Sequence, residues 1–314
     1  MARFSIGKAF GESFGLIGRR PLSVFVWGLL ILLPSVAGVL VLLPVFAAAE
    51  MGTEPDFSQF IQFQGISGLL NLVQILLMVV VYTAVMRAVV RPKEAALFSL
   101  RLGMDELRVA VVGIAIGVGV FAAMIIVVML AAAIGYAVLQ LNSPGNSIAI
   151  AALVVVLLLG ICLLMARISL IAPASVLYRD FAFVEGWKLG RGQAWPLFGM
   201  MVLLWLVVLL IEVAVVIAIL AAVGLGSVAT DPETFRTWVD PANWGDPIPW
   251  ITANWPWCVA GGVVVTFVYG IFLTLGVAPY ASACRQLVES SPAPAADMPP
   301  EPETTTEPAN TPEL

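Results

Sequence analysis

The chain has 314 residues, of which 61% are hydrophobic and only 11% are charged. Soluble domains are about 45–50% apolar and about 25% charged, so this composition excludes an ordinary soluble fold. The net charge is −5, and no basic soluble segment of the kind that binds nucleic acid is present.

A short segment with helical periodicity precedes the first long apolar stretch. Ile6, Phe10, Phe14 and Ile17 recur at helical spacing in one stripe, and charged residues fall on the opposite side. Amphipathic helices of this kind lie flat in a membrane interface, so we expect an interfacial helix at residues 6–17.

Six apolar stretches then follow one another along the chain. About 20 residues at 1.5 Å per residue cross a hydrocarbon core of about 30 Å, and each stretch is long enough. The predicted spans are residues 22–46, 65–90, 109–139, 148–177, 197–223 and 257–283. The sequence therefore predicts an all-α, polytopic membrane helix bundle, with six transmembrane helices in three hairpins, over residues 1–286.

The first span is followed by three alanines, residues 47–49, which resemble a signal-peptide cleavage site. The apolar core of a signal peptide is about 7–15 residues long, and this stretch is roughly twice that length. We therefore expect the first span to stay in the mature protein as a membrane anchor.

The three hairpins resemble repeats of one unit, in which an interfacial segment leads into an outward helix and a returning helix. The second such segment contains Leu97, Leu100, Met104 and Leu107 on one stripe. The third covers residues 181–192, where three glycines predict a bent or broken helix.

The returning helices of the second and third units share a local pattern. Each has an Ala-Pro pair and an arginine six residues after the proline, Pro173 with Arg179 and Pro279 with Arg285. Proline removes one backbone donor, so we expect a kink at each of these positions.

Basic residues are distributed unevenly between the loops. Fourteen of the fifteen Lys and Arg residues flank the same side of the predicted spans, and only Arg236 lies in one of the opposite loops. Short loops with basic residues stay on the cytoplasmic side. We therefore expect a bacterial cytoplasmic (inner) membrane protein with both termini in the cytoplasm.

Basic residues on this side are candidate contacts for anionic lipid headgroups. They are Arg19, Arg20, Arg167, Arg179, Lys188 and Arg191. Each basic residue near an anionic surface contributes about 1 kcal/mol of attraction. Membrane lipids are therefore the predicted partners, although simple anchoring also explains Arg167 because its side chain can snorkel to the interface.

A few polar residues and glycines interrupt the spans. Glu212 on the fifth span and Asn71 and Gln74 on the second lie at similar predicted depth, so the three could meet. Such a cluster could provide hydrogen bonds between helices, a substrate or proton site, or the wall of an outer vestibule. Gly113 and Gly117 form a GxxxG step, which predicts close helix packing.

Most catalytic chemistry is excluded by what the sequence lacks. It contains no histidine, which removes Ser-His-Asp and Cys-His catalysis and His-ligated metals. It also contains no GxxxxGK[ST] phosphate-binding loop. The three cysteines show neither metal-ligand nor disulfide spacing. We therefore predict that the protein is not an enzyme and holds no cofactor or metal.

Two further segments have distinctive compositions. The loop at residues 224–256 carries four tryptophans, which indicates either an aromatic belt at the outer interface or a lid over a cavity. Residues 287–314 are acidic and proline-rich with no Lys or Arg, a composition typical of a disordered tail.

One region resembles a known family. Residues 167–173 read Arg-Ile-Ser-Leu-Ile-Ala-Pro, and residues 185–192 read Glu-Gly-Trp-Lys-Leu-Gly-Arg-Gly, with Trp195 following. This segment resembles the bacterial integral membrane family named for the glycerophosphoryl diester phosphodiesterase membrane domain, related to the YciC-like proteins. The family usually has Ser and Thr where this chain has Gly186 and Gly190. The resemblance implies a polytopic membrane protein and does not carry the phosphodiesterase activity, since no catalytic domain is present.

Two function classes are compatible with these observations. The first is a protein that handles lipid or another amphiphile, or that serves membrane homeostasis. The alternative is a scaffold or assembly partner for other membrane proteins. A helix bundle serves both classes, so the sequence does not separate them.

The predicted orientation can be tested by cysteine labelling. In a variant without native cysteines, single cysteines in the loops after the first and fifth spans should react with impermeant thiol reagents from outside intact cells. Cysteines introduced at Arg101 or Lys188 should not react, because they are expected on the cytoplasmic side. The reverse pattern would contradict the orientation.

Overall fold

The computed structural model describes residues 4–50, 57–92, 97–140, 146–228, 252–253 and 255–290. The long helices are α2 (Pro21–Glu50), α3 (Phe57–Val90), α4 (Met104–Gln140), α5 (Asn146–Ile168), α8 (Ala194–Val228) and α11 (Trp255–Ser290). The shorter elements are α1 (Ile6–Arg19), the 3₁₀ turn η2 (Leu97–Ser99), α6 (Ile171–Tyr178) and α7 (Phe183–Leu189). These ranges contain no strand and include six segments long and apolar enough to cross a membrane, which confirms the all-α, multi-pass architecture.

The fourth predicted span is divided between two helices. α5 ends at Ile168 and α6 begins at Ile171, with Pro173 in the first turn of α6. Proline has no N–H, so Pro173 cannot donate the helical hydrogen bond to the carbonyl of Ser169. Pro279 instead lies inside α11, which continues to Ser290, so only the first of the two prolines separates helices.

The three predicted interfacial segments take different forms. α1 is a separate helix, and its buried residues are Ala9, Phe10, Ser13 and Leu16. Phe14, which the predicted stripe includes, is 47% exposed, because the buried side of α1 faces α11. The second segment is not a separate helix, since Met104 begins α4 soon after η2. The third forms only the short helix α7, as its glycines predict.

The last helix extends beyond the predicted end of the membrane domain at residue 286. α11 continues to Ser290, and the side chain of Leu287 is buried in the core. Residues 291–314, which include most of the acidic tail, lie outside the described residues. The same holds for most of the tryptophan-rich loop.

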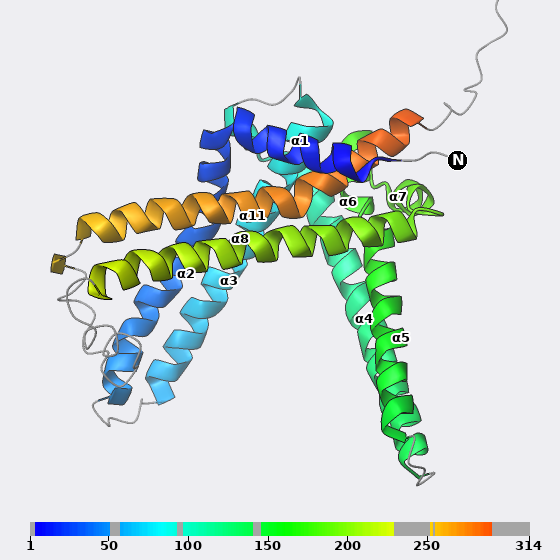
Figure 1. The fold of residues 1–314 in the computed structure, drawn as a ribbon, viewed down its shortest axis with the longest axis horizontal. Helices are drawn as coiled ribbons and strands as arrows, with labels where there is room; N and C mark the ends of the chain where they lie inside the picture. The colour runs from blue at the N-terminus through cyan, green and yellow to red at the C-terminus, as the bar shows by residue number, and fades with distance from the viewer. Residues whose placement is uncertain are drawn as a thin grey trace, which may run out of the picture.

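The long helices are joined at one end of the molecule and diverge toward the other (Figure 1). Two apolar clusters lie at the joined end. The first is centred on Trp27, Ile31, Val81, Val85 and Val277, and the second on Phe10, Leu170, Leu197, Met200 and Leu287. The core therefore holds the hairpins together near one set of helix ends rather than along their whole length.

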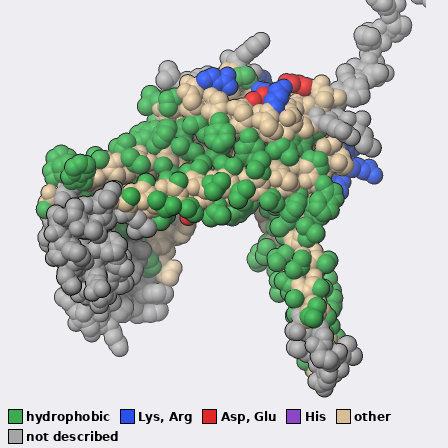
Figure 2. Space-filling view, in the orientation of Figure 1, with side chains coloured by type: hydrophobic (Ala, Val, Ile, Leu, Met, Phe, Trp, Pro, Cys, Tyr) green, Lys and Arg blue, Asp and Glu red, His purple; other side chains and the backbone are tan. Residues whose placement is uncertain are grey.

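The joined end also carries the basic residues, and we call it the basic end. It is defined by every Lys and Arg that the structure describes, namely Lys8, Arg19, Arg20, Arg87, Arg91, Arg101, Arg108, Arg167, Arg179, Lys188, Arg191 and Arg285. Figure 2 shows several of these charges above an apolar surface that covers the helices below them. The separation of charge from apolar surface matches what a bilayer requires of its interface and its hydrocarbon core.

Away from the basic end, α4 and α5 expose large apolar side chains. Phe121 on α4 and Val156 on α5 are 67% and 66% exposed. An apolar surface of this extent is suited to lipid, because lipid tails are as apolar as the side chains themselves.

Glycines mark the closest approach of two long helices. A Cβ on Gly28 of α2 would collide with the carbonyl oxygen of Thr266 in α11, and one on Gly270 of α11 would collide with that of Val24. Only glycine fits at these positions, because any side chain would push the two backbones apart.

The predicted close packing at the GxxxG step of α4 is wrong. A Cβ added to Gly113 or Gly117 would have no atom of a neighbouring element within 4 Å. These glycines lie on a face of α4 that no other described helix covers. Close packing occurs instead at Gly28 and Gly270, which belong to no GxxxG step within a single helix.

A matched pair of substitutions separates these two kinds of glycine. Gly270→Ala should lower the free energy of unfolding by about 1–3 kcal/mol, because the added methyl group overpacks the contact between α2 and α11. Gly117→Ala should leave it unchanged or raise it by up to about 1 kcal/mol, because alanine favours helix. Unfolding of both variants in mixed micelles measures the difference, and equal stability would contradict the close contact.

Candidate functional site

The predicted intramembrane polar cluster is only partly assembled. Asn71 and Gln74 of α3 line a cavity of about 180 Å³ against α2, where Pro34 and Ser35 form the other wall. The side-chain amide of Asn71 donates to the carbonyl oxygen of Ser67 at 3.0 Å. Glu212 is exposed on α8, which packs against α5 and α11 rather than α3. Asn71 and Gln74 therefore lie together as predicted, whereas Glu212 lies apart from them because α8 packs against other helices.

A larger polar network lies where α3 ends and α4 begins. The Arg87 guanidinium, whose side chain is 5% exposed, donates to Glu106 Oε1 at 2.5 Å and lies 3.5 Å from Asp105 Oδ2. Asp105 also accepts from Arg91 at 2.8 Å and from Arg108 at 3.1 Å. Two carboxylates in the first turn of α4 thus bind three arginines.

The local backbone explains how these side chains meet. Phe98 and Ser99 in η2 have φ of 61° and 54°, a left-handed conformation that non-glycine residues rarely adopt. Trp27 Nε1 donates to the carbonyl oxygen of Phe98 at 2.9 Å, and Arg87 donates to that of Ser99 at 2.9 Å. Buried side chains therefore hold the turn in place.

The start of α4 is capped from within its own first turn. Glu106 Oε2 accepts a hydrogen bond from the backbone N–H of Gly103 at 3.0 Å. A glutamate three residues into a helix commonly satisfies the free N–H before the helix in this way. Glu106 therefore fixes both the beginning of α4 and the buried charge of Arg87.

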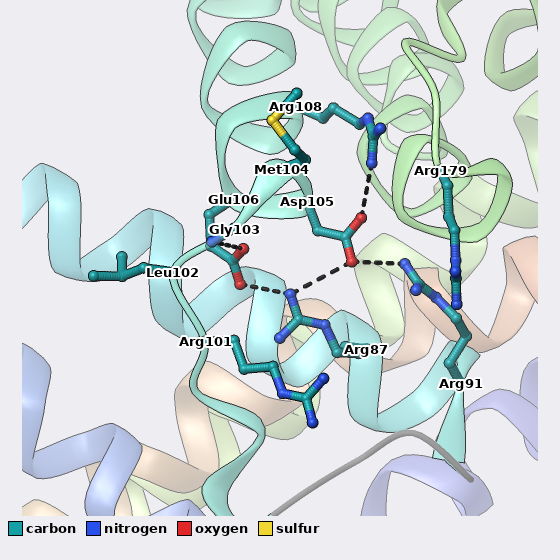
Figure 3. A pocket seen from close by; sticks show the side chains of 10 residues that line it. All are labelled: Arg87, Arg91, Arg101, Leu102, Gly103, Met104, Asp105, Glu106, Arg108 and Arg179. Atoms are coloured by element: carbon teal, nitrogen blue, oxygen red, sulfur yellow. Dashed lines mark hydrogen bonds and ion pairs between the residues drawn. The ribbon is translucent and has the colours of Figure 1, made fainter.

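Above this network is an open cavity of about 430 Å³, which we call the arginine cavity (Figure 3). Its charged lining consists of Arg87, Arg91, Arg101, Arg108, Arg179, Asp105 and Glu106. Among the described residues that line it, five guanidinium groups thus outnumber two carboxylates. Such a cavity favours anions, because guanidinium groups bind oxyanions through paired hydrogen bonds.

A second ionic site joins α1 to the end of α11. Arg285 pairs with Glu12 at 2.6 Å and donates to the carbonyl oxygen of Val89 at 2.7 Å, while the Ser282 hydroxyl donates to Glu12. Arg19 and Arg20 line an adjoining cavity of about 340 Å³. These two predicted headgroup contacts therefore lie beside a pair that fixes α1 in place.

The segment that carries the family resemblance folds around the break between α5 and α6. The Arg167 guanidinium lies 3.9 Å from the centre of the Trp187 ring, a cation–π contact. A Cβ on Gly186 would lie 2.6 Å from Ile171 Cα, and one on Gly190 would lie 2.7 Å from the Arg167 carbonyl oxygen. The two glycines let α7 approach this break closely.

The remaining predicted headgroup contacts lie around these elements. Lys188 and Arg191 are exposed at the end of α7, and Arg179 reaches into the arginine cavity from the end of α6. Arg87, Arg91, Arg101 and Arg108 belong to the basic stretch between the second and third spans, which the sequence places at an anionic membrane surface, but their spacing does not predict a shared cavity. The sequence feature that could have indicated an ionic network is the pair of acidic residues Asp105 and Glu106, which lies between Arg101 and Arg108.

Comparisons of the chain with protein-family models, with curated proteins and with solved structures find no match. Among the residues that the structure describes, no group of three or more Asp, Glu or Cys side chains is arranged to hold a metal ion. The arginine cavity is therefore the site with the most distinctive chemistry in the described part of the chain.

The buried ion pair between α3 and α4 gives a stability prediction. Glu106→Ala should lower the free energy of unfolding by about 3–5 kcal/mol, because it leaves the Arg87 charge buried without its main partner. The control is Glu289→Ala, which removes a 62% exposed carboxylate lying 3.6 Å from Arg285. That change should cost no more than about 1 kcal/mol.

The same experiment can identify the cause of the loss. A double variant, Arg87→Met with Glu106→Leu, should recover much of the stability because no unpaired charge remains. The comparison also needs Arg87→Met and Glu106→Leu as single variants. If the loss of unfolding free energy in the double variant equalled the sum of these two single losses, the unpaired charge would not be the cause of the destabilisation.

Proposed function

We propose that this integral membrane protein binds anionic lipid at its basic end and handles lipid or another amphiphile without catalysing a reaction. The observation that carries this proposal is the concentration of basic side chains beside an apolar, membrane-compatible surface (Figure 2). Anionic headgroups attract such a surface by about 1 kcal/mol per basic residue.

We also propose that the protein spans a bacterial inner membrane with its basic end on the cytoplasmic side. This proposal rests on the fourteen Lys and Arg residues that flank one side of the spans. The cytoplasmic leaflet carries anionic lipid, so the orientation and the lipid partner support each other. The proposal that the protein is not an enzyme rests on the absence of histidine from the whole sequence.

A scaffold for other membrane proteins is the second candidate. The observation that favours it is the long α4–α5 hairpin, whose apolar side chains Ile114, Phe121 and Val156 are exposed over several turns. Purification in native lipid separates the two functions. A stoichiometric membrane-protein partner that is lost on substitution of these residues supports a scaffold, whereas enriched anionic lipid supports lipid handling.

The lipid-binding proposal predicts a charge-dependent stabilisation. Phosphatidylglycerol added to the purified protein should raise its free energy of unfolding, by about 2.7 kcal/mol when the lipid is at 100 times its Kd. Phosphatidylcholine should raise it much less, and added salt should weaken the effect of phosphatidylglycerol.

Substitutions outside the arginine cavity test where this attraction arises. A variant with glutamine at Arg19, Arg20, Lys188 and Arg191 should lose most of the stabilisation by phosphatidylglycerol. Its control exchanges Arg and Lys at the same four positions, which keeps every charge. Equal stabilisation of the wild type by the two lipids would contradict the proposed function.

A further inference from the structure

A polar cavity of about 180 Å³ lies away from the basic end, between α2 and α3, which run side by side (Figure 1). At 1.5 Å per residue, Pro34 in its wall lies about 20 Å along α2 from Pro21, and Gln74 lies about 24 Å along α3 from Val90. A hydrocarbon core is about 30 Å thick. The cavity therefore lies at the depth of the acyl chains rather than at that of the charged headgroups.

The wall of this cavity contains a hydrogen-bond acceptor without a donor. Gln74 Oε1 is buried and accepts no hydrogen bond from any residue that the structure describes. Asn71 uses one N–H of its amide for the carbonyl oxygen of Ser67, which leaves a second N–H of the same group for another partner. Burial of an amide oxygen without a donor is unfavourable, so a group that supplies one completes the site.

The described wall is polar but uncharged. It consists of Pro34, Ser35, Gly38, Ser67, Leu70, Asn71 and Gln74. The sequence of α2 has no charged residue from Pro21 to Ala49, and that of α3 has none from Phe57 to Met86. A hydroxyl group suits this wall, because it donates to Gln74 Oε1 and also accepts from an amide N–H or a serine hydroxyl. An uncharged donor that cannot accept would satisfy only part of the wall.

Apolar side chains flank the cavity on both helices. Ser35 and Asn71 in its lining are exposed, so the cavity is open on one side. Val36 and Leu72 directly follow these two residues and are 53% and 54% exposed. In a bilayer, exposed valine and leucine at this depth contact acyl chains. A ligand that enters from the bilayer therefore combines a hydroxyl group with an apolar chain.

We propose that this cavity binds the hydroxyl headgroup of an uncharged amphiphile such as diacylglycerol. The hydroxyl would donate to Gln74 Oε1, and the acyl chains would lie along Val36 and Leu72. A cavity of this size holds the headgroup alone, since pockets that enclose a drug-sized ligand measure about 300–1,000 Å³. The inference rests on the part of the proposed function that concerns an amphiphile, and it assigns a second site apart from the basic end.

The test is photo-crosslinking of the full-length protein in phosphatidylcholine nanodiscs. The probe is a diacylglycerol that carries a diazirine in one acyl chain, and the labelled positions should map to α2 and α3 around the cavity. Unlabelled dioleoylglycerol should compete about fivefold more strongly than 1,2-dioleoyl-3-acetylglycerol, because the acetyl ester lacks the O–H donor and one neutral hydrogen bond contributes about that factor.

Substitutions in the cavity locate the hydroxyl. Gln74→Leu removes the acceptor at similar side-chain size and should reduce the competition by dioleoylglycerol about fivefold, to that of the ester. The matched control, Gln64→Leu, changes an exposed glutamine of α3 outside the lining and should have no effect. Ser35→Ala changes an exposed lining residue, so it tests the cavity even if Gln74→Leu unfolds, and it should reduce the competition about twofold or more.

Two results would overturn this proposal. One is equal competition by the alcohol and the ester, or competition that neither Gln74→Leu nor Ser35→Ala changes. The other is labelling that does not map to the cavity, which would leave water as its occupant. Stabilisation by phosphatidylglycerol is measured separately on the same preparations. If it persists, the hydroxyl site alone is wrong, whereas its loss as well would contradict the proposed function.

Discussion

Arg87 is a charge held almost completely inside the protein, and its acceptors come from η2 and from the first turn of α4. Burial of an unpaired guanidinium is unfavourable by several kcal/mol. Arg87 can therefore stay buried only while Ser99, Asp105 and Glu106 remain within reach of its side chain. The interaction therefore fixes where α4 begins relative to α3. Because Asp105 also binds Arg91 and Arg108, the same constraint builds the floor of the arginine cavity.

The remainder of the fold is arranged around a compact basic end. α2 and α11 approach each other most closely at Gly28 and Gly270, and α1 is fastened across α11 by Glu12 and Arg285. Beyond these contacts the hairpins separate, so along most of their length α4 and α5 pack mainly against each other and leave their outer faces uncovered by the described elements. In a bilayer, lipid supplies the missing contacts at little cost, because acyl chains pack against leucine and valine as other side chains do.

Close backbone contact also explains the glycines in the segment that resembles a known family. Gly186 and Gly190 stand where that family usually has Ser and Thr. Gly186 faces the start of α6 and Gly190 faces the end of α5, both at distances too short for a side chain. The family assignment itself stays a prediction. What the geometry explains is why this chain uses glycine there. Trp187 of α7 covers Arg167 of α5 at the same contact.

The sequence by itself determined the six apolar spans and the concentration of Lys and Arg on one side, because composition and local periodicity suffice for both. It did not determine which spans touch. The GxxxG step of α4 has no neighbour, Glu212 lies apart from Asn71 and Gln74, and Pro173 separates two helices whereas Pro279 does not. Only the tertiary structure decided that Arg87, Arg91, Arg108 and Arg179 share one cavity, because side chains from α3, α4 and α6 meet there through the packing angles of the helices rather than through spacing along the chain.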